Sequence, residues 1–108
     1  MVEIPKLSEA TFRKEVLEAG QPVLVEFTAV WCQPCKQLDP IVQQLAQEWG
    51  SKIKVFKLDV DDNPNLALDY TVMSVPTLVL FKDAEPVERI AGLQPKDRLL
   101  KKFSPYLI

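Results

Sequence analysis

The sequence predicts one α/β domain over residues 1–108, built on a mixed sheet with helices on both faces. Strand-like and helix-like segments alternate along most of its length, which is typical of strands joined by helical crossovers. Residues 23–29 and 53–60 flank a long helical pattern, so these two strands should run parallel with a right-handed crossover. Residues 77–81 and 87–91 follow each other across a short turn, which predicts an antiparallel hairpin at a sheet edge.

A first helix is expected over roughly residues 8–19. Phe12 and Val16 lie four residues apart in this segment, which places them on one face of a helix. Ser8 can cap the first turn, and Gly20 is well placed to end the helix. This helix should therefore pack an apolar face against the rest of the domain.

The next two elements form the centre of the domain. Residues 23–29 are apolar almost without interruption, which predicts a central strand buried on both faces. After it, apolar residues recur at helical spacing from Leu38 to Trp49, and the pattern stops at Gly50. Pro34 suits the first turn of this helix, because the N–H group that proline lacks has no partner there.

The remaining elements are shorter. Residues 2–6 are a candidate for an additional strand. The chain continues with a strand over 53–60, a short helix over about 64–70, a strand over 77–81, a turn over 83–86, a strand over 87–91 and a final helix that opens at Pro95. The predicted order is therefore αβαβαββα, with the additional strand in front.

Composition places the chain among ordinary globular domains. Of its 108 residues, 47% are hydrophobic and 26% are charged, with 13 lysines and arginines against 15 aspartates and glutamates. The net charge of −2 lacks the basic excess that nucleic acid or an anionic membrane surface would require, so neither is an expected partner. The sequence has neither a signal-peptide pattern nor an apolar run long enough to span a bilayer, which predicts a cytoplasmic protein.

Several kinds of site are excluded by residues that the chain lacks. It has no histidine, which removes Ser-His-Asp and Cys-His catalysis within the chain. Its three glycines lie far apart, so they cannot form a dinucleotide-binding or phosphate-binding loop. The acidic residues from Asp59 to Asp62 do not match a calcium loop, because Pro64 stands where that loop requires glycine. We expect no metal site.

The two cysteines are the main candidates for chemistry. Cys32 and Cys35 lie between the central strand and the long helix, where open α/β sheets usually place their sites. Their spacing puts both side chains on the same side of a helical turn, so they can form a disulfide with little backbone movement. Cys32 would stand at the helix N-terminus, where free N–H groups favour a thiolate over a thiol. Cys32 is therefore the expected nucleophile, and Cys35 is suited to resolve the mixed disulfide that Cys32 forms with a substrate.

Three other interpretations of the pair remain open on spacing alone. A structural disulfide is one, although such a short ring constrains the unfolded chain very little. Half of a zinc site is another, which would need a second chain to supply the missing ligands. The pair could also be two buried core cysteines.

The cysteine motif and several later residues together resemble the thioredoxin family. They are Trp31-Cys32-Gln33-Pro34-Cys35-Lys36 after an apolar strand, Pro40 in the following helix, Val75-Pro76-Thr77, Phe81-Lys82 and Gly92. The resemblance covers essentially the whole chain, in order and without large insertions. It implies a thioredoxin fold, in which a five-stranded mixed sheet is flanked by four helices. It also implies a protein-disulfide reductase with a redox-active Cys32–Cys35 disulfide that serves electron transport and cell redox homeostasis.

The resemblance also implies the partners of the reaction. No cofactor is expected to be bound, because NADPH would recharge the cysteine pair indirectly through a flavoprotein, thioredoxin reductase. The substrates would be disulfide-containing proteins, and we expect a monomer. Two alternatives remain open: a thiol oxidase or isomerase on the same fold, and a non-catalytic thioredoxin-like binding module.

The resemblance assigns a substrate-binding role to the segment around Val75 and Pro76. It implies a cis peptide bond before Pro76, facing the cysteines. Such a bond ahead of a strand can leave the backbone N–H and C=O groups of Val75 unpaired, and an extended substrate could pair with them. The alternative is an ordinary turn proline. The residues expected to surround Cys32 and contact substrate are Trp31, Gln33, Pro34, Val75, Pro76, Gly92 and Leu93.

Two charged residues interrupt apolar strands. Glu26 lies in the central strand and Lys57 in the neighbouring one, so both are expected to be partly buried and close together. Burial would raise the pKa of Glu26 towards the working pH and make it a candidate proton relay for Cys35, with Lys57 as its partner. The alternative is that Glu26 reaches solvent past the sheet edge while Lys57 extends along it.

The chain departs from the usual thioredoxin pattern at several positions. Glu26 stands where aspartate is usual, Gln33 replaces a glycine between the cysteines, and Thr28 stands where many members have tryptophan. Ser74 and Ala84 occupy positions where glycine is frequent. The residue between the cysteines contacts both sulfurs, so Gln33 can change the redox equilibrium in a direction that the sequence does not specify. The absence of a histidine between the cysteines favours a reductase over an oxidase.

Overall fold

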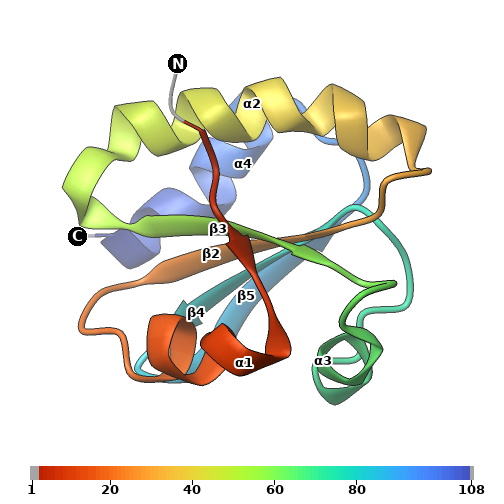
Figure 1. Ribbon diagram of the computed structural model, residues 1–108. Helices are drawn as coiled ribbons and strands as arrows, with labels where there is room; N and C mark the ends of the chain where they lie inside the picture. Colours follow the sequence, from red (N-terminus) through yellow and green to blue (C-terminus); the bar gives the residue numbers. More distant parts are fainter. Residues whose placement is uncertain (1–2, 108) are drawn as a thin grey trace.

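A five-stranded sheet lies between two layers of helices in the computed structural model, which describes residues 3–107 (Figure 1). Helices α2 (Gln33–Trp49) and α4 (Lys96–Phe103) cover one face. Helices α1 (Glu9–Phe12) and α3 (Pro64–Asp69) cover the other face. The α/β fold and its helices on both faces are as the sequence predicted.

The sheet has a mixed topology with the most apolar strand at its centre. The strands are β1 (Lys6–Leu7), β2 (Val23–Thr28), β3 (Lys54–Asp59), β4 (Thr77–Lys82) and β5 (Glu85–Ala91). Their order is β1-β3-β2-β4-β5, with β2 and β3 parallel and β4 antiparallel to both β2 and β5. The central parallel βαβ unit and the edge hairpin are thereby confirmed. The additional strand exists as β1, parallel to β3, but only residue 6 of the expected 2–6 belongs to it, and residue 2 lies outside the described residues.

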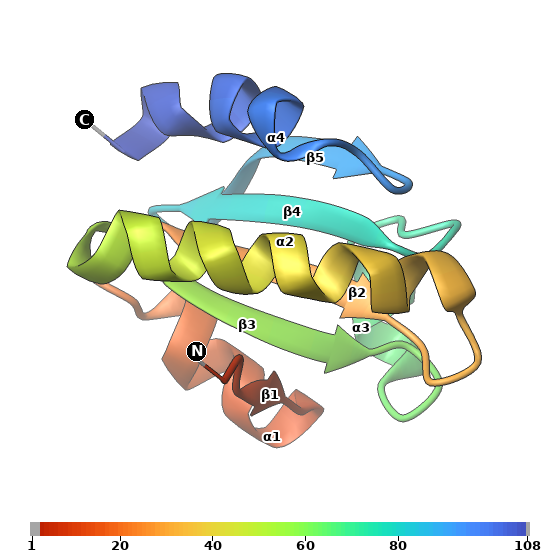
Figure 2. The same cartoon turned by 90° about the horizontal axis from the view of Figure 1, so that it is seen from above.

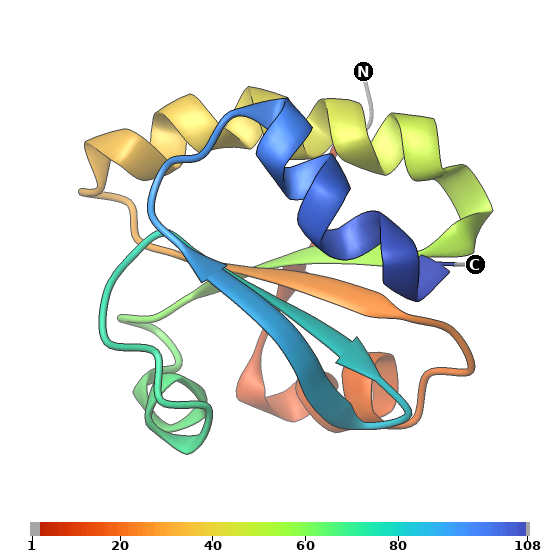
Figure 3. The same cartoon turned by 180° about the vertical axis from the view of Figure 1, so that it is seen from behind.

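Strand β2 divides the interior into two apolar cores. Val23, Val25 and Phe27 point to the side of α1 and α3, while Leu24 lies in the core beneath α2 and α4. By the alternation of a strand, Glu26 points to the same side as Leu24. The central strand therefore places one carboxyl group in the core beneath α2. Seen from behind, α4 returns from β5 across the same face of the sheet as α2 (Figure 3).

The first helix ends earlier than its sequence pattern predicted. After α1, residues 13–17 continue as a wider turn, in which the Glu18 N–H donates to the Arg13 carbonyl across five residues at 2.9 Å. The helical segment thus ends at Leu17 rather than at residue 19, and Gly20 does not adopt the left-handed conformation that would end a helix. Phe12 and Val16 are nevertheless buried, so the apolar face was correctly predicted.

Two turns depend on backbone conformations with positive φ. Helix α2 runs through Pro40 to Trp49, and Gly50 follows it at φ 57°, as expected for a glycine at a helix end. The hairpin between β4 and β5 turns through Asp83 and Ala84, whose φ angles are 53° and 69°. Two such residues make a hairpin turn that suits twisted strands, so β5 begins at Glu85, two residues before its predicted start. Among residues 3–107, no helix is both long enough and apolar enough to cross a bilayer.

Candidate active site

The candidate site lies at one end of the sheet, where several loops meet (Figure 2). The loop after β2 carries the cysteine motif, the segment before β4 carries Val75 and Pro76, and the loop after β5 carries Gly92. The Gly92 N–H donates to the Pro76 carbonyl at 2.8 Å, which joins the last two loops. Gly92 has φ 87°, a conformation that favours glycine over other residues.

Cys32 and Cys35 form a disulfide at the N-terminus of α2. Their Cα atoms are 5.3 Å apart, and Cys32 occupies the N-cap position of the helix, as the sequence predicted. The backbone N–H of Cys35 donates to Cys32 Sγ at 3.2 Å. Both residues are buried, at 3% and 1% exposure, against Ala29. A sulfur anion at Cys32 would therefore accept a hydrogen bond and lie at the positive end of the helix dipole, both of which lower a cysteine pKa.

The predicted substrate-binding residues differ in their exposure. Trp31 is 67% and Leu93 41% exposed, and Gln33 and Pro34 are exposed as well. Val75 and Gly92 are half-buried. Pro76 is buried at the start of β4, and its carbonyl accepts a hydrogen bond from the Gly92 N–H.

Among residues 3–107, the backbone of Val75 has hydrogen-bonding groups without a partner. The bond between Val75 and Pro76 is cis, as the thioredoxin resemblance implied. Within residues 3–107, neither the N–H nor the C=O group of Val75 forms a hydrogen bond. The side chain of Val75 packs against the cluster of Ala29, Cys32 and Cys35, which holds these free backbone groups beside the disulfide.

Three residues of this surface were missed by sequence reasoning. Val30 and Met73 are 73% and 88% exposed, and Met73 lines a hollow of about 140 Å³ together with Trp31 and Val75. Asp61 accepts a hydrogen bond from the indole N–H of Trp31 at 2.8 Å, which orients the ring. From the sequence, the acidic residues from Asp59 to Asp62 indicate only that no calcium loop is present. A signal was available for Val30 and Met73, because each is an apolar residue in the loop next to a motif, Val30 directly before Trp31 and Met73 two residues before Val75.

Glu26 is fully buried, so the alternative that it reaches solvent is wrong. Burial raises the pKa of Glu26 from its usual value of 4.5 to about 9, the neighbouring Asp39 adds to this rise, and Lys57 opposes it. In the described part of the chain, neither carboxyl oxygen of Glu26 has a hydrogen-bond partner. The carboxyl group is therefore mainly protonated at neutral pH, because its pKa lies above the working pH rather than near it.

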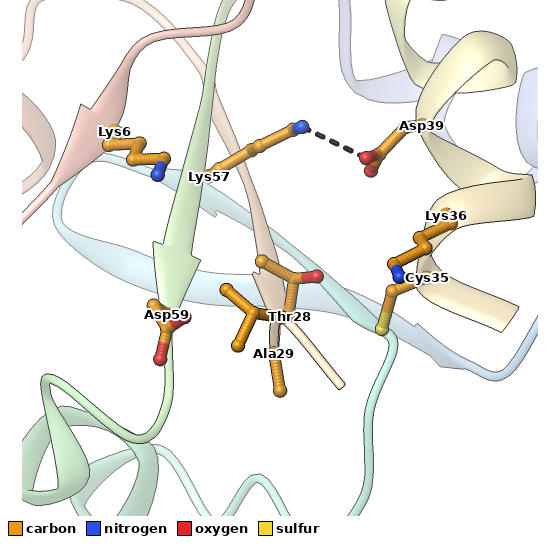
Figure 4. Close-up of a pocket in the computed structure, with 9 residues that line it drawn as sticks. Lys6, Thr28, Ala29, Cys35, Lys36, Asp39, Lys57 and Asp59 are labelled. Carbon is orange, nitrogen blue, oxygen red and sulfur yellow. Dashed lines mark hydrogen bonds and ion pairs between the residues drawn. The ribbon is translucent and has the colours of Figure 1, made fainter. Parts of the chain in front are cut away.

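Lys57 lies beside Glu26 in the sheet but binds another acid. The two residues are paired in register between β2 and β3, as their positions predicted. The Lys57 ammonium group, however, forms an ion pair with Asp39 of α2, with 3.0 Å between Nζ and Oδ2 (Figure 4). The expectation that Lys57 is the direct partner of Glu26 is therefore corrected. Asp39 was missed because the strand pattern does not show which helix residue lies above the sheet.

A cavity lies between Cys35 and the ion pair of Asp39 and Lys57. It has a volume of about 270 Å³ and is lined by Cys35, Asp39 and Lys57 among others. Figure 4 shows Cys35 and Asp39 on the same helix, with Lys57 reaching towards Asp39 from β3. Glu26 does not line this cavity. The site thus combines a disulfide at a helix N-terminus, a free backbone segment and a buried acid.

Comparison with known proteins agrees with this arrangement. The family model described as Thioredoxin matches residues 3–104. Thioredoxin of Mycobacterium tuberculosis is 46% identical over 99 residues, which cover 92% of this chain and 85% of that protein. Thioredoxin of Synechocystis is 41% identical over 107 residues, which cover 99% of this chain and 100% of that protein. Thioredoxin M4 of Arabidopsis thaliana chloroplasts is 43% identical over 107 residues, 99% of this chain and 55% of that protein.

Proposed function

Because this chain belongs to the thioredoxin family, we propose that Cys32 attacks substrate disulfides and that Cys35 resolves the intermediate. The protein is a thiol-disulfide oxidoreductase that reduces protein disulfides through this dithiol. The observation that carries the assignment of roles is the position of Cys32 at the N-cap of α2, where the Cys35 N–H donates to its sulfur. These features stabilise the attacking thiolate.

Reduction of a substrate disulfide proceeds in two thiol–disulfide exchange steps. The Cys32 thiolate attacks one sulfur of a substrate disulfide, forms a mixed disulfide and releases the first substrate thiolate. Cys35 then loses its proton and attacks the Cys32 sulfur, which closes the Cys32–Cys35 disulfide and releases the second substrate thiolate. Two electrons pass from the dithiol to the substrate. We assign Glu26 the relay of the Cys35 proton: its ionised form, a minority at neutral pH because the pKa is about 9, accepts that proton directly or through a water, and the resulting acid returns it to solvent.

Protein substrates bind, in this proposal, across the loops around the disulfide. Trp31 and Leu93 supply exposed apolar area there, with Gln33 and Pro34 beside Cys32. An extended substrate segment pairs with the free N–H and C=O groups of Val75, as an added strand would. Such a small apolar surface suits brief contacts with many proteins.

The oxidised pair must be reduced again after each cycle. In this proposal a flavoprotein, thioredoxin reductase, transfers electrons from NADPH to the Cys32–Cys35 disulfide, and this chain holds no cofactor itself. The protein acts as a monomer in a reducing compartment, the cytoplasm, where thiols stay reduced between turnovers.

The redox equilibrium of the cysteine pair tests the proposed function. In graded dithiothreitol or glutathione buffers, the pair should stay oxidised until the buffer is more reducing than the cytosolic glutathione pool, about −220 to −260 mV. Tryptophan fluorescence and alkylation of free thiols measure the oxidised fraction, and a Cys35→Ser variant provides the reduced baseline. A pair that is reduced in a more oxidising buffer would move the protein to the oxidase or isomerase class. Failure to form the disulfide would contradict both classes.

A further inference from the structure

Two carboxyl groups meet in the core beneath α2 without enough hydrogen-bond partners. Both oxygens of Glu26 and Oδ1 of Asp39 are buried, and none of the three has a partner among residues 3–107. Only Oδ2 of Asp39 is satisfied, by Lys57 at 3.0 Å. An ionised Asp39 beside Glu26 disfavours a second negative charge there, so the buried carboxyl group of Glu26 favours its neutral form.

The charges around this pair come from three elements. The titratable or charged groups that line the adjoining cavity are Cys35, Lys36 and Asp39 from α2, Lys57 and Asp59 from β3, and Lys6 from β1. On the other sides, β4 and α4 contribute apolar side chains to the same core, among them Leu78 and Leu99. Lys57 is therefore the cation nearest to Glu26 in the sheet, yet its ammonium group is bound by Asp39.

We propose that Asp39 is a positioning residue for proton transfer: it holds the Lys57 ammonium group away from Glu26 and places its own negative charge beside the Glu26 carboxyl group. This inference rests on the proposed relay by Glu26 and extends it. Glu26 does not line the cavity beside Cys35, whereas Asp39 lines it and is 28% exposed. Asp39 thereby sets how readily the Glu26 carboxyl group takes up and gives up a proton.

The test is a titration of Glu26 in the oxidised protein. The carboxyl carbon is followed by NMR in protein labelled with ¹³C-glutamate, and its signal is assigned by its loss in Glu26→Gln. The Asp39→Asn variant removes a neighbouring negative charge and frees Lys57 to approach Glu26. The pKa of Glu26 should fall by about one unit or more, since both changes favour the ionised form.

Three further variants distinguish the effect of Asp39 on Glu26 from a general change in structure. Lys57→Met should raise the pKa of Glu26, the opposite direction, because it removes the opposing cation. Asp39→Glu keeps a carboxylate and should keep the pKa close to that of the unchanged protein. Asp59→Asn is the matched control, since Asp59 lines the same cavity but does not bind Lys57, and it should leave the pKa of Glu26 nearly unchanged.

An unchanged pKa of Glu26 in folded Asp39→Asn would overturn the proposal, and so would an equal fall in Asp59→Asn. If Asp39→Asn does not fold, Lys57→Met decides: a rise supports the proposal, and no rise overturns it. Because the titration needs no substrate, its result does not depend on whether the proposed function is correct. If the relay by Glu26 operates, the pH profile of disulfide reduction should move with the Glu26 pKa in each variant, and a profile that stays fixed would contradict the relay alone.

Discussion

A Cys35→Ser variant should accumulate stable mixed disulfides between Cys32 and its protein substrates and lose turnover by about a thousandfold or more. Cys32 keeps its place at the N-cap of α2, so its attack on substrate continues. The second step stops, because a serine hydroxyl cannot displace the substrate sulfur. Mass spectrometry of non-reduced complexes with a disulfide-containing protein such as insulin measures the trapped species.

Cys32→Ser is the matched control for this prediction. It should lose turnover to the same extent but trap nothing, because Cys35 lies within the first turn of α2, behind the N-cap position that Cys32 occupies. Equal trapping by both variants would contradict the assigned roles. Unchanged binding of the same substrates without either thiol would favour a non-catalytic binding module.

Replacing Glu26 with leucine should stabilise the folded protein, most strongly in alkaline solution. Glu26 lies opposite Leu78 of β4 and next to an apolar core, and its oxygens have no hydrogen-bond partner in the described part of the chain. A buried polar group without a hydrogen-bond partner costs about 1–3 kcal/mol, so replacing Glu26 with an apolar side chain of similar volume should raise the free energy of unfolding by about that amount.

The pH dependence of this gain has a definite sign. The folded-state pKa of Glu26, about 9, lies above its usual value of 4.5, so the folded protein binds this proton more tightly than the unfolded chain does. The stability that the proton provides is complete below pH 4.5 and is lost as the pH rises towards 9. The difference between Glu26→Leu and the unchanged protein should therefore be smallest in acid and largest at pH 9.

Urea unfolding of both oxidised proteins at pH 5, 7 and 9 measures this difference. Glu26→Gln is a useful control, since it removes the titration but leaves a buried amide without partners. It should lose the same pH dependence and gain less stability than leucine provides. A leucine variant that is less stable than the unchanged protein at pH 9 would show that Glu26 is ionised and bound in the folded state.

The elements that carry the site were predictable from local signals. The unbroken apolar run of β2 requires burial on both faces, and the helical spacing that follows requires a crossover, so Cys32 and Cys35 had to lie at a strand-to-helix junction. The extent of the first helical segment, which comprises α1 and the wider turn that continues it to Leu17, was less predictable. Its apolar face follows from the spacing of Phe12 and Val16, but its end at Leu17 depends on a wider turn that the spacing does not encode.

By itself, the sequence determined the fold class and the placement of Cys32 and Cys35 at a strand-to-helix junction, because spacing and polarity within one segment decide these features. Whether Glu26 is buried stayed open in the sequence and was decided by the tertiary structure. Only the tertiary structure decided that Pro76 points inward while Val30 and Met73 stay exposed, since that depends on how separate loops pack. It also decided that Lys57 binds Asp39 rather than Glu26. An ion pair forms with the acid that packing brings within reach, and the distance between a helix and a strand far apart in the chain is set by the core between them.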